Sequence, residues 1–466
     1  GAATAVVVIA CAPAAPPTTT PAPPKPAEPA KPAAEPTKPV AATPTKAPVA
    51  QPTPTPVPAT PKPAAKAPVQ LTYANYSSGA DKDVWETLGK EFNQQHPNVS
   101  VKYLPVPGGS WGEYFDKLAT QIAGGNPPDV VRVAIEGTQL FVAKGLALPL
   151  DDFIKTDPDI KEFFDDVHPR LLEVFRVGGK TYEFPLDWNN MFVFYNVKLF
   201  EKEGIAPPKK DWTKDDFLSI AKQLTKRSSA TAEPEVWGFG FTNAYFSATM
   251  PWIFNAGSNL LSEDWTKSNA NDPKLVEAIQ FMRDLVWEHK VSPKPQGLEA
   301  QNLFAAGKIA MIGGGRWPVL GLTRAGFFDF DVQYWPKWRE QITEYGVGGF
   351  PMVKGTRYPD EAWLWIRFLT SKRAFEYMTK LGYSIPARRS TANSPVMFEL
   401  PPKNAKAYYE SIEGNARPVP SPPEYNTVEN IFLRYTGQVF ANEKPAKEAM
   451  EGAHKEIAEL LAKRPK

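Results

Sequence analysis

The chain has 466 residues, a formal net charge of +2 at pH 7, 12% aromatic residues and a single cysteine. The near-neutral charge gives no basis for nucleic-acid binding, and one cysteine excludes an internal disulfide. A chain of this length exceeds what one hydrophobic core holds, so two lobes are expected.

Residues 1–11 have the pattern that ends an export signal. An apolar run, Val6 to Ala10, precedes Cys11, and "VIAC" resembles the bacterial lipobox, whose cysteine is acylated with diacylglycerol. The alternative is a buried, inert cysteine, but nothing around Cys11 has the periodicity of a core. No other apolar run is long enough to span a bilayer. We therefore expect an exported protein that a lipid on Cys11 anchors to the outer face of the cell membrane, in the periplasm or at the cell surface.

Residues 12–68 are rich in Pro, Ala and Thr. They hold 20 of the 50 prolines of the chain, with no aromatic residue and no glycine. Such a segment cannot bury enough apolar surface to offset the entropy of ordering, and proline favours extended polyproline II. We predict a disordered spacer that holds a domain away from a surface.

Beyond the spacer, apolar periodicities predict strands and helices in alternation. Val69, Leu71 and Tyr73 alternate as in a strand, and helical spacing runs from Val84 to a stop at His96-Pro97. This order indicates an α/β fold with βαβ units, a mainly parallel sheet and helices on both faces. The further predicted elements are a strand at 99–103, a helix at 114–122, a short strand in "NPPDVVRV", and helices at 275–286, 362–369 and 446–461.

Seven segments occur in an order that carries a resemblance: "GADKDVWETLGKEFNQQHPNVSVKY", "NPPDVVRV", "AKGLALPLDDF", "GGKTYEFPLDWNNMFVFYNVKLFEKEGIAPP", "FAAGKIAMIGGGRW", "DEAWLWIRFLTS" and "GYSIPARRS". Together they resemble the extracellular solute-binding proteins of ABC importers, in the carbohydrate-binding class similar to maltose-binding protein. The resemblance covers nearly all of residues 69–466. It implies the type II periplasmic-binding-protein (Venus-flytrap) fold, in which two α/β lobes clamp a ligand.

The resemblance also implies where the chain passes between lobes. The expected crossings lie near residues 185–190, 334–337 and 385–388. The expected N-lobe is then 69–187 plus 337–384, and the expected C-lobe is 188–336 plus 385–466.

A carbohydrate site in the cleft follows from the same resemblance. Sugars present apolar C–H faces and a rim of hydroxyls, so their sites combine flat aromatic rings with planar polar groups. Trp317 follows three glycines at the position where relatives stack a tryptophan on a sugar; the alternative is a core tryptophan between the lobes. The other expected ligand-binding residues are Tyr76, Glu136, Trp188, Asn189, Tyr245, Trp252, Arg316, Tyr345 and Arg417, the last of which could instead pack at the hinge.

Signals for other chemistry are weak. The stretch at Gly307-Lys308 is not a P-loop, because Asn302 and Ile309 replace the required Gly and Ser/Thr. The four histidines lack metal-ligand spacing, so no metal and no cofactor are expected. Adjacent acidic pairs such as Asp151-Asp152 are more typical of helix caps than of a glycosidase.

We therefore expect a monomeric binding protein, not an enzyme, with a sugar and the permease subunits of an ABC importer as partners. Three alternatives stay open: a binding protein for another small solute such as a polyamine or a sugar phosphate, a secreted glycoside-acting enzyme, and a surface adhesin.

Overall fold

The first elements form as the sequence predicts. In the computed structural model, which describes residues 67–77, 79 and 81–464, strand β1 (Val69–Tyr76) is followed by helix α1 (Lys82–Gln95), strand β2 (Val99–Val106) and helix α2 (Trp111–Ala123). The helix α1 ends at the residue before His96-Pro97, as expected. Strand β1 lies between β2 and β3 (Val130–Val131) in a parallel sheet. The anchor at Cys11 and almost all of the expected spacer lie outside the described residues.

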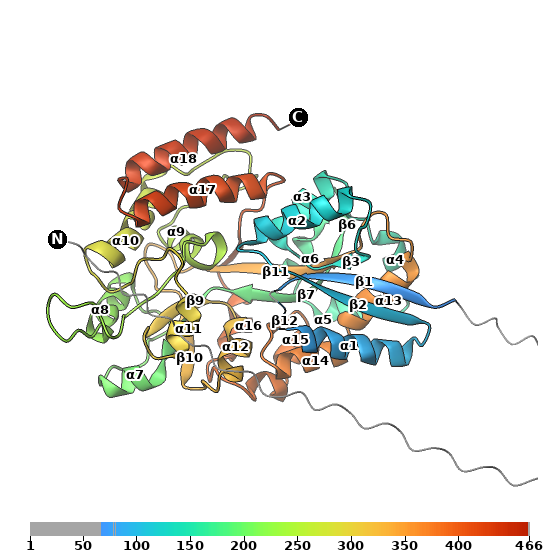
Figure 1. Ribbon diagram of the computed structural model, residues 1–466, viewed down its shortest axis with the longest axis horizontal. Coiled ribbons are helices and arrows are strands. Elements are labelled where there is room, and N and C mark those ends of the chain that lie inside the picture. Colours follow the sequence, from blue (N-terminus) through green and yellow to red (C-terminus); the bar gives the residue numbers. More distant parts are fainter. Residues whose placement is uncertain (1–66, 78, 80, 465–466) are drawn as a thin grey trace, which may run out of the picture. The chain divides into compact units, whose positions relative to one another are not determined.

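The remaining elements are runs of helices and runs of strands, not a regular alternation (Figure 1). From β4 to α10 they are β4 (Val133–Ala134), α3 (Ile135–Ala143), α4 (Asp151–Thr156), α5 (Ile160–Asp166), α6 (Pro169–Glu173), β5 (Arg176–Val177), β6 (Lys180–Thr181), β7 (Glu183–Asn190), β8 (Phe192–Asn196), α7 (Val197–Lys202), α8 (Lys214–Leu224), the π-helix η1 (Tyr245–Thr249), α9 (Met250–Asn255) and α10 (Pro273–Trp287). After them come α11 (Ala300–Ala305), β9 (Met311–Gly314), α12 (Pro318–Arg324), β10 (Phe330–Tyr334), β11 (Thr343–Pro351), α13 (Pro359–Leu369), α14 (Lys372–Lys380), β12 (Ile385–Pro386), α15 (Arg389–Ala392), the 3₁₀-helix η2 (Pro395–Phe398), α16 (Lys406–Glu413), β13 (Ala416–Pro418), α17 (Tyr425–Phe440) and α18 (Ala446–Leu461).

Two long strands run side by side through the middle of the molecule in Figure 1. They are β7 and β11, and they pair antiparallel from Tyr345 opposite Asn190 to Pro351 opposite Glu183. With β12, β13 and β4 they form one sheet. Only Met191 separates β7 from β8, yet β8 pairs with β9 and β10 in a different sheet. The chain therefore passes from one sheet to another at the end of β7.

The expectation of a mainly parallel sheet was wrong. Among the ladders of the described strands, β1–β2, β1–β3 and β11–β13 are parallel, whereas β11–β7, β11–β4, β12–β7, β10–β8, β8–β9 and β5–β6 are antiparallel. The early βαβ pattern covers only the first sheet. Apart from the β5–β6 hairpin, the antiparallel pairs join strands from distant parts of the chain, such as β7 with β11 and β8 with β9, and their connections contain helices.

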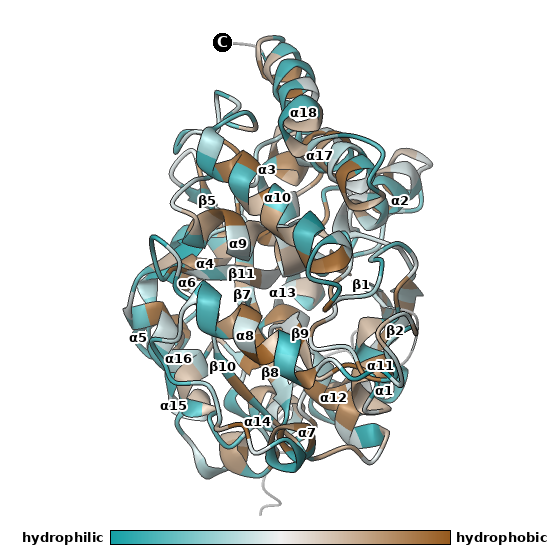
Figure 2. Ribbon diagram, turned by 90° about the vertical axis from the view of Figure 1, so that its left-hand side faces the viewer, coloured by the Kyte–Doolittle hydropathy of each residue, from teal (hydrophilic) through white to brown (hydrophobic). Residues whose placement is uncertain are grey.

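The C-terminal helices confirm the predicted apolar stripe. In α18, Ala449, Met450, Ala453 and Ile457 are buried at helical spacing, and this helix packs against α17. Figure 2 shows hydrophilic and hydrophobic residues alternating around α18, as expected for a helix with one buried face. Within the described ranges, no helix has both the length and the apolar character needed to cross a membrane.

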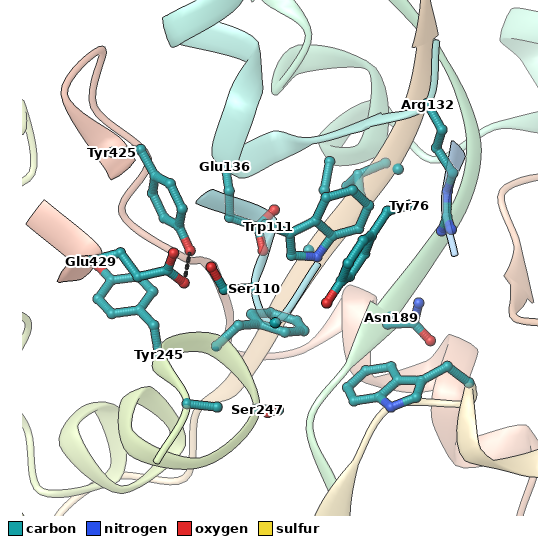
Figure 3. A pocket seen from close by; sticks show the side chains of 18 of the residues that line it. Tyr76, Ser110, Trp111, Arg132, Glu136, Asn189, Tyr245, Ser247, Tyr425 and Glu429 are labelled. Carbon is teal, nitrogen blue, oxygen red and sulfur yellow. Dashed lines mark hydrogen bonds between the residues drawn. The ribbon is translucent and has the colours of Figure 1, made fainter. Parts of the chain in front are cut away.

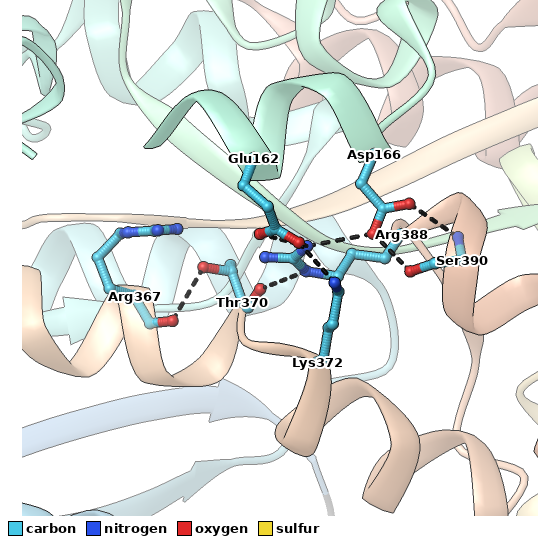
Figure 4. Close-up of polar contacts among 7 residues, drawn as sticks. All are labelled: Glu162, Asp166, Arg367, Thr370, Lys372, Arg388 and Ser390. Atoms are coloured by element: carbon cyan, nitrogen blue, oxygen red, sulfur yellow. Dashed lines mark hydrogen bonds and ion pairs between the residues drawn. The ribbon is translucent and has the colours of Figure 1, made fainter. Parts of the chain in front are cut away.

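A buried arginine ties three segments together just after β12 (Figure 4). Arg388, of which the side chain is 3% exposed, donates through Nη1 to Glu162 at 2.9 Å and to Asp166 at 3.1 Å. Its Nε donates to the Thr370 carbonyl at 2.9 Å. The guanidinium also lies 5.1 Å from the centre of the Phe163 ring. One side chain thus joins α5 to the end of α13.

We expect Arg388→Met to lower the free energy of unfolding by about 2–3 kcal/mol, because it removes a buried cation and leaves Asp166 partly desolvated. Urea titration measures this loss. The matched control is Arg434→Met, since Arg434 pairs with Glu456 while 52% exposed. An Arg388→Met midpoint equal to that of the control would show that the network contributes no stability.

Candidate functional site

A cavity of about 440 Å³ lies beside the β7–β11 pair. Its lining comes from β1, α2, α3, β7, η1, the start of α12 and α17, which are far apart in the sequence. Tyr76 is the last residue of β1 and Glu136 lies in the first turn of α3, so both follow the ends of strands. In Figure 3, Tyr425 and Glu429 lie at one end, Arg132 and Asn189 at the other, and Tyr76 and Trp111 between them.

Aromatic rings line two parts of this cavity. The ring centroids of Tyr76 and Trp111 are 4.8 Å apart, and the Tyr76 hydroxyl donates to the Gly108 carbonyl at 3.1 Å. Trp317 and Phe246 contribute a second pair, with centroids 6.2 Å apart. Trp317 is 37% exposed, although large apolar side chains are normally buried. An indole that remains accessible in a cavity offers a flat surface for stacking.

A glycine makes room for this indole. A Cβ at position 315 would lie 2.3 Å from the Trp317 ring and 2.7 Å from the Asn189 Cβ. Asn189 is fixed in turn, because its Oδ1 accepts a hydrogen bond from the Arg316 backbone N–H at 2.9 Å. Gly315, the last of the three glycines, therefore lets Trp317 and Asn189 approach each other within the cavity.

A buried ion pair lies at the other end. Arg132 Nη2 donates to Asp187 Oδ2 at 2.7 Å, and the two side chains are 12% and 2% exposed. Arg132 Nη1 donates to the Tyr383 hydroxyl at 3.3 Å. Burial alone would lower the pKa of Arg132, but the Asp187 carboxylate raises it instead. A Cβ at Gly348 would meet Asp187 Oδ1 at 2.4 Å, so this pair also depends on a glycine.

Two further carboxyls line the cavity without a basic partner. Glu136 is 2% exposed and Glu429 is 5% exposed. Burial, assisted by the nearby Glu429 carboxylate, raises the pKa of Glu136 to about 8. Burial also raises the pKa of Glu429, whose Oε1 accepts a hydrogen bond from the Tyr425 hydroxyl at 2.9 Å. Neither Glu136 Oε2 nor Glu429 Oε2 has a hydrogen-bond partner among the described residues.

A third carboxyl lies deeper, in β11. Glu344 is fully buried, and neither of its carboxyl oxygens bonds to a described residue. Burial, followed by the charge of Glu136, raises its pKa. The folded state therefore holds protons that the unfolded chain releases above its ordinary pKa of 4.5. The protonated Glu344 carboxyl therefore makes its full contribution to the free energy of unfolding below pH 4.5. That contribution falls as the pH rises through the raised pKa of the folded state.

We expect Glu344→Met to raise the melting temperature, and to raise it more near pH 8 than near pH 5, because methionine keeps the volume and removes the buried ionisable group. The gain near pH 8 should correspond to about 1–3 kcal/mol. Melting curves at the two pH values measure it, with exposed Glu448→Met as control. An equal effect of Glu344→Met at both pH values would contradict the raised pKa.

Five of the ten residues expected in the site line this cavity: Tyr76, Glu136, Asn189, Tyr245 and Trp317. They come from five separate elements or their flanks. Tyr245, 1% exposed, lies in the π-helix, where its hydroxyl donates to the Pro420 carbonyl at 3.2 Å. The structure thus brings these five together, while their contact with a ligand stays a prediction.

The other five do not line the cavity. Trp188 and Trp252 are fully buried in the hydrophobic core, where Trp188 packs edge-on against Tyr409 at 5.8 Å. The Arg316 side chain points into the protein and donates to the Ser384 and Thr379 carbonyls at 2.9 and 3.2 Å. Tyr345 is 4% exposed within β11, and Arg417 lies on β13 with its side chain exposed. In a strand, alternate side chains face opposite ways, so Asn189 faces the cavity and its neighbour Trp188 does not.

Sequence reasoning missed several lining residues, among them Trp111, Arg132, Asp187, Phe246, Tyr383 and Glu429. Two of them had a local signal. Arg132 lies within "PDVVRV", directly after a buried strand, and Asp187 lies within the expected first crossing at 185–190. Glu429 is a polar residue on the buried face of α17, and only tertiary packing brings it to Glu136.

Comparisons with known proteins address the fold and the family. A putative binding protein of Brucella abortus (strain 2308) is 27% identical over 257 residues, which are 52% of this chain and 57% of that protein. A maltotriose-binding protein of Pyrococcus abyssi is 22% identical over 77% of this chain and 79% of its own length. The solved structure of an ABC substrate-binding protein from Listeria monocytogenes, in complex with cycloalternan, matches with a TM-score of 0.77 and 24% identity over 85% of this chain and 100% of the other.

The structural match confirms the two-lobed α/β fold of type II binding proteins. These relatives are binding proteins by description. Residues 76–374 match the model of the family described as bacterial extracellular solute-binding protein. The chain therefore belongs to the family of bacterial extracellular solute-binding proteins.

Proposed function

We propose that the chain captures a carbohydrate in the cavity between its lobes and delivers it to an ABC importer. The observation that carries this proposal is the accessible indole of Trp317 in a cavity that also holds Asn189, Glu136 and Glu429. A pyranose ring needs an aromatic face together with planar polar groups around its rim. The maltotriose and cycloalternan named for the two relatives support the same ligand class.

Capture would proceed by closure of the two lobes. With the lobes at 69–187 plus 337–384 and 188–336 plus 385–466, Tyr76 and Glu136 belong to the first and Asn189 and Trp317 to the second. A ligand that touches both lobes favours the closed state in proportion to its differential affinity for that state. The chain then acts as a carrier and not as an enzyme.

A thermal-shift screen of the full chain against monosaccharides and oligosaccharides tests this function. A saccharide present at one hundred times its dissociation constant should stabilise the fold by about 2.7 kcal/mol, which is about 3 °C for a domain of this size. Polyamines and sugar phosphates serve as comparison ligands. A shift with these ligands alone, or no shift with any saccharide, would refute a carbohydrate function.

The lipobox-like sequence indicates where the protein would act. We propose that Cys11 carries the lipid that holds the exported chain at the membrane next to the permease. We expect Cys11→Ser to move the protein from the membrane fraction to the soluble fraction without changing its saccharide affinity. Fractionation and calorimetry measure the two properties, and retention of the variant in the membrane fraction would contradict the anchor.

A further inference from the structure

The lining of the cavity carries more acidic than basic side chains. Its described lining contains one basic side chain, Arg132, and three carboxyls, those of Glu136, Asp187 and Glu429. Arg132 is paired with Asp187 at 2.7 Å, and Figure 3 shows it at the opposite end from Glu429. Glu136 and Glu429 therefore form no ion pair with a basic side chain of the described lining, although the charge of Arg132 lowers the pKa of Glu136 against the larger effect of burial.

Both carboxyls are buried deeply and are only partly bonded. Their residues are 2% and 5% exposed, and each has one carboxyl oxygen that bonds to no residue the structure describes. Figure 3 shows both beside Ser110 and Tyr425. The Ser110 hydroxyl accepts a hydrogen bond from the Glu113 backbone N–H at 3.2 Å, and together with the Gly112 backbone N–H it lowers the pKa of Glu429 against the larger effect of burial. Buried carboxyls without a compensating partner are costly unless a ligand supplies one.

Aromatic rings lie at this end and in the middle of the cavity. Tyr245 and Tyr425 meet edge to face at 5.6 Å, and Tyr76 lies against Trp111 at 4.8 Å. The faces of such rings attract cations, above all ammonium groups that have left water. Carboxyls and ring faces together are complementary to an organic cation, whereas a neutral sugar hydroxyl requires no excess negative charge.

From this arrangement we infer that the cavity selects a saccharide bearing an ammonium group, an amino sugar, whose nitrogen lies between Glu136 and Glu429. This inference rests on the proposed carbohydrate function and names its ligand class. The ammonium group would bond to the two carboxyls, and a sugar ring of the ligand would stack on Trp317. Although burial favours the protonated carboxyls in the empty cavity, an adjacent cation lowers the pKa of a carboxyl, so binding expels the proton.

Matched sugars separate the charge from the sugar ring. The probes are glucosamine, galactosamine, mannosamine and the β-1,4-linked glucosamine disaccharide, each compared with its hydroxyl and N-acetyl counterparts by calorimetry on the full chain at neutral pH. At least one amino sugar should bind roughly tenfold or more tightly than both counterparts. In Glu429→Gln the ratio of amino-sugar to neutral-sugar affinity should fall to about threefold or less. In the control Glu448→Gln, which changes an exposed glutamate of α18, the ratio should not change.

The outcomes are distinct. If neutral or N-acetyl sugars bind as tightly as the amino sugars, the inference is overturned and the carbohydrate function stands. If an amino sugar is preferred and Glu429→Gln keeps that preference, the placement of the ammonium group is wrong. If no saccharide binds, amino or neutral, the carbohydrate function fails and the inference fails with it.

Discussion

Trp317→Ala should weaken saccharide binding roughly tenfold or more while the ligand-free protein keeps its melting temperature. The indole is 37% exposed, so its removal costs the ligand-free fold little. Removing a stacking surface loses about 1.5–3 kcal/mol of binding energy, and 1.4 kcal/mol already corresponds to a factor of ten. Calorimetric titration and ligand-free melting of this one variant measure both effects.

A second tryptophan provides the matched control. Trp188 lies on β7 between the cavity-lining Asp187 and Asn189, but it is fully buried and its ring packs on Tyr409 instead of facing the cavity. Trp188→Ala should destabilise the fold by about 3–5 kcal/mol through the cavity that it leaves. If Trp317→Ala gave the signature expected of Trp188→Ala, with a large melting loss and unchanged affinity, Trp317 would be a core residue.

Asp187→Ala should destabilise the ligand-free protein by about 3–5 kcal/mol, because it leaves the guanidinium of Arg132 buried without its carboxylate. The pair is 12% and 2% exposed, with 2.7 Å between Nη2 and Oδ2. Urea titration measures the loss. The effect arises from the unpaired charge and not from the lost contact alone.

Two controls identify that cause. The double variant Asp187→Ala with Arg132→Met removes both charges and should recover part of the lost stability. Asp165→Ala breaks a pair with Lys161 whose side chains are 65% and 82% exposed, and such a pair contributes little. A double variant no more stable than Asp187→Ala would show that Arg132 is not the source of the loss.

Local periodicity was sufficient to predict elements that have one buried face. The alternation from Val69 and the helical spacing from Val84 predicted β1 and α1, and the stripe from Ala446 predicted α18, because each has one buried face. The strands β7, β8 and β11 carry no such alternation, because they are buried on both faces. The hydrophobic pattern of such a strand does not indicate whether it pairs parallel or antiparallel. This is why the antiparallel sheets were missed.

The site was predictable where a residue follows a recognisable motif. Tyr76, Glu136 and Trp317 line the cavity next to motifs of the family. Trp188 and Arg316 lie in such motifs too, but their side chains point away from the cavity. Consecutive side chains of a strand face opposite ways, so the motif alone does not show which of two neighbours faces a ligand. Glu429 lies in α17, almost three hundred residues after Glu136, and no local signal joins them.

The central claim is that a carbohydrate binds in this cavity, and a crystal structure of the full chain with the saccharide that gives the largest thermal shift tests it most directly. The account predicts a sugar ring against the Trp317 indole, with polar groups within hydrogen-bond distance of Asn189 and of Glu136 or Glu429. A saccharide bound elsewhere on the protein, with the cavity beside β7 and β11 free of it, would contradict the account.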